Sequence, residues 1–222
     1  MSSAAEGRSR RALDPFEAWG RGVRDLTGDD LAWFRSQGVP LMALLGERMP
    51  PDQVRVWRAH GLDPAAVEDP AFRVARARVR FLRNRRFAFE RDGRAPAEDA
   101  VPAYVMPEFD EAMGLLDIVA WHPRSRRVAS WAGTVGLLGS KAIEAAGDVP
   151  LQLWPSPLEW LRAWRSGAVV VNDALARPTL LDAGTILTAD VDHGIALQAM
   201  LTKVRLPRIL VSAQAQPQQV AA

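Results

Sequence analysis

The stretch LQLWPSPLEWLRAWRSGAVVVN, residues 151–172, sets the pattern for the second half of the chain. Two short apolar segments, 151–154 and 168–172, flank a segment that predicts a helix. Short apolar strands joined by helical crossovers are typical of a buried parallel sheet. On the intervening helix, Trp160 and Trp164 are expected to share one face, which indicates packing on the sheet more than stacking on a base.

The same alternation continues on both sides of this stretch. Toward the C-terminus, segments 185–189 and 208–212 predict strands, and 178–184 and 193–203 predict helices. Upstream, three strand-like segments lie close together and predict an antiparallel meander: 103–106, 115–121 and 127–131. The predicted fold class is therefore mixed α/β. A short-helix N-terminal part and a small antiparallel β meander precede a mostly parallel sheet with flanking helices.

The N-terminal part differs in composition and predicts short helices. Thr27 is placed to begin one of them, with Asp30 three residues on as a variant of the capping box, and Gly38 suits the position after its end. A further helix is expected over 51–61. We predict disorder for residues 1–12 and 212–222, a helical arginine-rich region over 13–94, and an α/β domain over 95–211.

Residues 71–94 carry the densest positive charge of the chain. Up to Arg86, apolar residues at helical spacing predict a helix with a second stripe of arginines beside the apolar one, and Phe87 and Phe89 then alternate as in a strand. The arginines of this stripe are Arg73, Arg76, Arg80 and Arg83. A guanidinium group matches the geometry of a phosphate, so the stripe is a candidate nucleic-acid contact. The alternative is a solvated face that pairs with acids of the second half.

Composition excludes several classes of protein. The 222 residues include no cysteine, so disulfides, thiol catalysis and cysteine-bound zinc are excluded. No apolar stretch is long enough for a membrane span, and the N-terminus lacks the apolar core of a secretory signal, so a cytoplasmic location is expected. The net charge is only +2, and arginine far outnumbers lysine, which indicates a GC-rich bacterial or phage genome.

Acidic residues collect where the predicted parallel strands end. Asp173 follows the strand at 168–172, and Asp190 and Asp192 follow the strand at 185–189. Ligands bind outside the carboxyl ends of such strands, and carboxylate oxygens suit Mg²⁺. If the strand continues through Asp192, both of its aspartates lie on one face. The alternative is that Asp190 or Asp192 caps the helix that begins near His193.

The segment TILTADVDHGIALQAM, residues 185–200, resembles the last strand and helix of the Toprim fold of bacterial and phage primases, topoisomerases and related nucleases. Residues 103–131 are similar to the β meander that precedes this fold in primases. The resemblance covers roughly residues 100–211 and implies a nucleic-acid role with a metal at Asp173, Asp190 and Asp192. The family has a glutamate followed by glycine after its first strand, where this chain has Trp154-Pro155-Ser156-Pro157.

The missing glutamate decides which function is expected. Without a proton-transfer group, metal-dependent phosphoryl chemistry is weakened, so we expect an accessory protein that binds DNA or RNA and has a non-catalytic Toprim-like domain. One alternative is a Mg²⁺-dependent phosphoryl-transfer enzyme with Glu159 as a distant base. Another is a structural or protein-interaction module in which the arginine stripe is buried against Glu108, Asp110 and Glu111.

Overall fold

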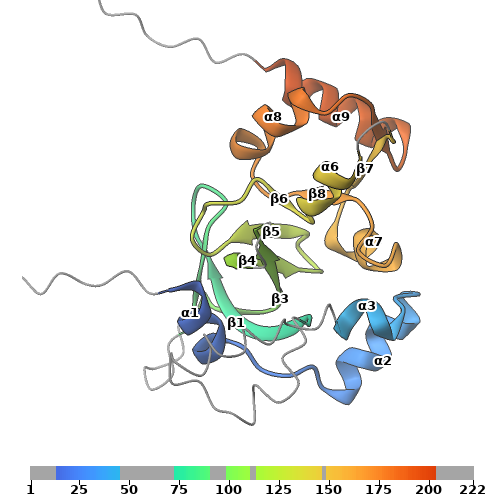
Figure 1. Cartoon of the computed structure of the whole chain (residues 1–222). Coiled ribbons are helices and arrows are strands. Elements are labelled where there is room, and N and C mark those ends of the chain that lie inside the picture. Colours follow the sequence, from blue (N-terminus) through green and yellow to red (C-terminus); the bar gives the residue numbers. More distant parts are fainter. Residues whose placement is uncertain (1–13, 46–72, 91–98, 111–113, 147–148, 204–222) are drawn as a thin grey trace, which may run out of the picture.

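The computed structural model describes residues 14–45, 73–90, 99–110, 114–146 and 149–203 (Figure 1). It is a mixed α/β structure with two sheets. In Figure 1 the N-terminal helices lie at one end of the molecule, and the last two helices lie at the opposite end beyond the second sheet. Among the helices in these ranges, none is long and apolar enough to cross a membrane.

The first sheet has five antiparallel strands in the order β2-β1-β3-β4-β5. The strands are β1 (Ala75–Phe81), β2 (Phe87–Phe89), β3 (Val101–Phe109), β4 (Leu115–His122) and β5 (Arg127–Ser130). The predicted meander is confirmed as β3, β4 and β5. The Ser130 N–H donates to the Arg85 carbonyl at 2.9 Å, so the end of β5 meets the start of β2 and the sheet curls. Helix α1 (Pro15–Gly22) adds Trp19 to the core inside the curl.

The helix predicted over residues 71–86 is wrong, because the described part of this segment is strand β1. Its buried residues alternate with arginines: Ala75, Ala77 and Val79 are buried in the core inside the curl, and the arginines between them point to the other face. Small apolar residues at this spacing fit a helical stripe as well as a strand, and pairing with β2 and β3 decides between them. β1 and β2 therefore belong to the same sheet as the meander.

The second sheet is mixed, in the order β6-β8-β7-β9. Its strands are β6 (Leu137–Leu138), β7 (Leu151–Trp154), β8 (Ala168–Val170) and β9 (Ile186–Thr188). β7 pairs in parallel with β8 and β9, as the strands predicted at 151–154, 168–172 and 185–189 require, and β6 pairs antiparallel with β8. The helices are α6 (Lys141–Ala146), α7 (Pro157–Arg162), α8 (Asp173–Asp182) and α9 (Val191–Thr202). The strand predicted at 208–212 lies outside the described residues.

The two helices that follow α1 cover the core that the two sheets share and separate it from solvent. Helix α2 (Gly28–Ser36) begins with the predicted capping box, in which Asp30 and Thr27 bond reciprocally, and Gly38 has a φ of +76°. Helix α3 (Leu41–Leu45) follows, and the helix expected over 51–61 lies outside the described residues. Phe34 and Leu44 are buried in one cluster with residues of both sheets.

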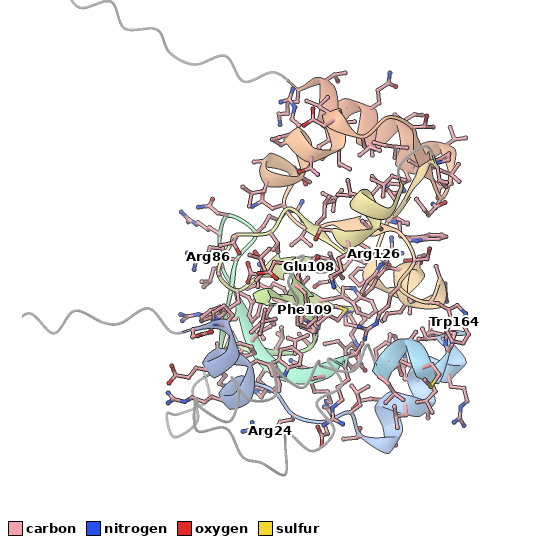
Figure 2. The ribbon with its side chains drawn as sticks, viewed as in Figure 1. Arg24, Arg86, Glu108, Phe109, Arg126 and Trp164 are labelled. Atoms are coloured by element: carbon pink, nitrogen blue, oxygen red, sulfur yellow. The ribbon has the colours of Figure 1, made fainter. Side chains whose placement is uncertain are left out.

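Helix α7 ties the second sheet to these N-terminal helices. Arg165 Nε, just beyond α7, donates to the Ala43 carbonyl at 2.7 Å. The prediction that Trp160 and Trp164 share one helical face is wrong, because α7 ends at Arg162. Trp160 is buried in the core, whereas Trp164 adopts a left-handed conformation (φ +58°) and is 64% exposed (Figure 2).

Candidate functional site

The aspartates after β9 begin a helix instead of extending the strand. β9 ends at Thr188, and Asp190 is the N-cap of α9, where its carboxylate accepts the His193 N–H at 2.7 Å. Asp192 lies in the first turn of that helix. The expectation that both aspartates project from one strand face is therefore wrong, and capping accounts for Asp190.

Asp173 is separated from these residues by a whole strand. It follows β8, and β7 lies between β8 and β9, so two strand spacings, about 10 Å in all, part the two strand ends. Its carboxylate lies 3.8 Å from the Arg85 guanidinium. Glu159, the distant candidate base, accepts the hydroxyl of Ser156, the N-cap of α7. Within the described ranges, no group of three or more acidic or histidine side chains is placed to hold a metal ion.

Two variants of Asp190 separate capping from metal binding. Asp190→Ala is expected to lower the free energy of unfolding by about 1 kcal/mol, because the His193 N–H loses its acceptor. Asp190→Asn is expected to leave it nearly unchanged, since asparagine caps equally well. Thermal unfolding of both variants with and without Mg²⁺ tests this. Stabilisation of the native chain by Mg²⁺ that Asp190→Asn abolishes would instead indicate a metal site.

The arginines of the predicted stripe are mostly paired with acids. Arg73 contacts Asp25 at 2.7 Å, Arg76 contacts Asp30 at 3.1 Å, and Arg80 lies 3.9 Å from Asp99. Arg78, which the predicted stripe left out, pairs with Glu90 at 2.5 Å.

These partners differ from the acids expected for a structural module. Glu108 is buried elsewhere, Asp110 accepts the Gly114 N–H at 2.6 Å, and Glu111 lies outside the described residues. Arg83 is exposed in the turn after β1, and the described residues provide it with no ion pair. Each of these paired arginines lies beside an acid, so the pairs carry little net positive charge. The predicted row of arginines is therefore a weak candidate for a phosphate-binding surface.

A cavity of about 570 Å³ lies at one end of the first sheet. Antiparallel register places Arg76, Tyr104 and Trp121 side by side on one face of that sheet. Helix α2 covers this row with Asp30 and Trp33. The cavity is lined by Asp30, Trp33, Arg76, residues 101–104, and residues 122–124 of the turn between β4 and β5.

Aromatic rings form one wall of the cavity. Trp33 and Tyr104 stack with their ring centroids 5.6 Å apart and an interplanar angle of 18°. Phe34 meets Tyr104 at 4.6 Å and Trp121 meets it at 5.9 Å, so the ring pair rests on buried aromatic side chains. The wall is therefore held rigidly before any ligand arrives.

A hydrogen-bonded network fixes the polar floor of the cavity. The Tyr104 hydroxyl donates to Asp30 Oδ1 at 2.9 Å, and the Thr27 N–H donates to Asp30 Oδ2 at 2.7 Å. Burial opposes the charged form of Asp30, but the hydrogen bonds from Thr27 and Tyr104 and the charge of Arg76 outweigh it and hold the pKa of Asp30 below its usual range. Burial and the Asp30 carboxylate raise the pKa of Tyr104, so its hydroxyl remains a donor.

The turn between β4 and β5 completes the rim. His122 ends β4, and its Nδ1 accepts the Ser125 N–H at 3.2 Å, which leaves the ring proton on Nε2. Burial, together with the charges of Arg124 and Arg127, lowers the pKa of His122, so the imidazole is neutral at pH 7. Arg124 is exposed at the cavity and supplies positive charge there.

The sequence pattern identified Asp30 as part of a capping box, and it assigned neither Asp30 nor Trp33 to a binding site. The one feature of the sequence that could have pointed to this cavity is Tyr104, which is the only tyrosine of the chain and follows an arginine-rich segment. Searches against protein-family models, curated proteins and solved structures find no match to this chain, so its function has to be inferred from its own residues.

Proposed function

We propose that this chain binds single-stranded nucleic acid, with a base in the cavity against Trp33 and Tyr104. The observation that carries the proposal is the combination of a stacked aromatic wall with the exposed guanidinium group of Arg124 in one cavity. Proteins that bind single strands combine these two elements, because every base has a flat face and every nucleotide a phosphate. A base paired within a duplex has no free face for such a wall.

The second sheet supports the finer proposal of a degenerate Toprim-like unit. Three parallel strands, β8, β7 and β9, are linked by helices, and acidic residues follow β8 and β9. Pro155 and Ser156 follow β7, where the family has its glutamate. We therefore assign this unit a binding role without catalysis. The pairing of Arg73 and of the β1 arginines with acids favours the rival role of a protein-interaction module without nucleic acid.

Trp33→Leu tests the proposal, because leucine keeps apolar volume and removes the stacking surface. Affinity for a labelled oligothymidylate of about ten nucleotides, within the usual site size for one binding fold, is expected to fall roughly 5- to 100-fold. Fluorescence anisotropy at several salt concentrations measures it. The matched control is Trp164→Leu, which removes an exposed tryptophan outside the cavity and is expected to leave affinity unchanged.

The two roles give different results in this experiment. Binding of the native chain should weaken as salt increases, because phosphate contacts release counterions. Absence of binding even at low salt, or equal losses in Trp33→Leu and Trp164→Leu, would overturn the proposed function. Displacement of the oligonucleotide by a poly-glutamate peptide as readily as by unlabelled oligothymidylate would favour the protein-interaction role.

A further inference from the structure

The turn between β4 and β5, residues 123–126, presents two exposed arginines beside the cavity. Arg124 lines the cavity itself, and Arg126 follows it two residues later (Figure 2). Arg126 has a φ of +54°, which is the left-handed region. Glycine adopts this conformation without steric cost, whereas a residue with a Cβ is strained there.

Two other arginines with left-handed backbones have structural contacts. Arg85 pairs with Asp173 at 3.8 Å and accepts the Ser130 N–H through its carbonyl. Arg165 donates to the Ala43 carbonyl at 2.7 Å and so holds α3. The Arg126 side chain makes no hydrogen bond or ion pair with any residue that the structure describes. Hairpin loops built around a type I turn often place a residue in this left-handed region, so the loop accounts for the backbone of Arg126. What indicates a function outside the fold is its exposed guanidinium group, which lacks such a contact and lies two residues from a residue that lines the cavity.

We propose that this turn, through Arg124 and Arg126, binds successive phosphates of a polynucleotide whose base occupies the cavity. This inference rests on the proposed function and narrows its ligand to a strand of several nucleotides. A mononucleotide reaches Arg124 at the cavity and leaves Arg126 uncontacted. The guanidinium group suits the task because it stays charged and donates in a fork that matches two phosphate oxygens.

The test replaces Arg126 with the residue that its backbone prefers. Arg126→Gly is expected to unfold at the same temperature as the native chain or higher, because the steric strain is relieved. Its affinity for the oligothymidylate is expected to fall, and the slope of log affinity against log salt is expected to lose about 0.7, the value for one phosphate contact on a single strand. Arg126→Lys should keep that slope.

Controls separate this contact from a general effect of charge. Lys203→Gln removes one positive charge just beyond the end of α9, outside the cavity, and is expected to leave the slope unchanged. Thymidine monophosphate, used as the short probe, should bind Arg126→Gly and the native chain equally.

The outcomes distinguish the two proposals. An unchanged slope in Arg126→Gly, when the native chain binds the oligothymidylate, overturns this inference and leaves the proposed function standing. The same holds for an Arg126→Gly variant that unfolds well below the native temperature, because that shows a structural role for the side chain. A native chain that binds no oligothymidylate at low salt overturns both.

Discussion

Replacing Asp117 with alanine is expected to lower the free energy of unfolding by about 3–5 kcal/mol, because several donors lose their acceptor together and each buried donor left unsatisfied costs about 1–3 kcal/mol. The Asp117 carboxylate, in the middle of β4, is 0% exposed. It accepts the N–H groups of Ile118 at 2.7 Å, Ala132 at 2.8 Å and Thr134 at 2.9 Å, and the Thr134 hydroxyl at 2.9 Å. Alanine leaves these donors without the acceptor that the carboxylate supplies.

The position of Asp117 explains why the effect reaches beyond β4. Ala132 and Thr134 belong to the connection that leads from β5 of the first sheet to β6 of the second. A single carboxylate therefore holds the segment that joins the two sheets. We expect Asp117→Ala to loosen this connection as well as to lower the stability of β4.

Urea unfolding followed by circular dichroism measures the effect. Asp117→Asn is expected to fall between the native chain and Asp117→Ala, because its amide keeps one acceptor oxygen and presents an N–H₂ group to the other donors. The control is Asp182→Asn, an exposed acid in the last residue of α8, with an expected change within about 0.5 kcal/mol. A loss below about 1 kcal/mol in Asp117→Ala would show that water replaces the carboxylate.

The second sheet follows from the sequence because its strands are local features. Residues 151–154 form β7 with the predicted bounds, since the apolar segment is short and Pro155 and Pro157 follow it. Proline cannot continue a central strand and suits the start of a helix. The bounds of the strands at residues 168–170 and 186–188 are likewise set by the local sequence.

β1 shows where local pattern fails. In ARARVRF, residues 75–81, alternate positions are apolar, but Ala75 and Val79 also fall on a helical stripe with Phe72 and Leu82. Alanine and arginine favour a helix intrinsically. The strand forms because β2 and β3 supply backbone partners on both sides, and β3 comes from a distant part of the sequence.

The cavity could not be predicted from the sequence pattern for the same reason, because contacts between distant segments form it. Trp33, Arg76, Tyr104 and Arg124 come from four separate segments, and only the curl of the first sheet and the packing of α2 bring them together. The strand-end aspartates present the opposite problem. Capping and metal binding both call for aspartate before a helix, so position alone could not tell that Asp190 bonds the His193 N–H.

Replacing Glu108 with glutamine is expected to change how stability depends on pH. The Glu108 side chain of β3 is 4% exposed and also joins the two sheets. Its carboxylate accepts the N–H groups of Gly139 and Ser140, each at 2.8 Å, and the Ser140 hydroxyl at 2.6 Å. Burial raises the pKa of Glu108 and outweighs the hydrogen bonds and the Lys141 charge, which lower it.

The sign of the effect follows from this raised pKa. The folded chain holds the Glu108 proton more tightly than the unfolded chain, so folding is stabilised at low pH. The free energy of unfolding of the native chain therefore falls as the pH rises from the usual value of 4.5 through the raised pKa of the folded state, and the loss is constant above it. Glutamine does not titrate, so Glu108→Gln lacks this fall.

The comparison is made as a difference between the two proteins across pH. Below the window, Glu108→Gln is expected to be less stable by about 1–3 kcal/mol, because its amide N–H₂ faces the N–H donors of Gly139 and Ser140. Through the window the native chain loses stability and the variant does not, so the difference narrows. Urea unfolding of both proteins from pH 4 to 8 measures it, with Asp182→Asn as the control whose difference stays constant. A difference that widens with pH would mean that the three donors outweigh burial and keep Glu108 ionised in the folded protein.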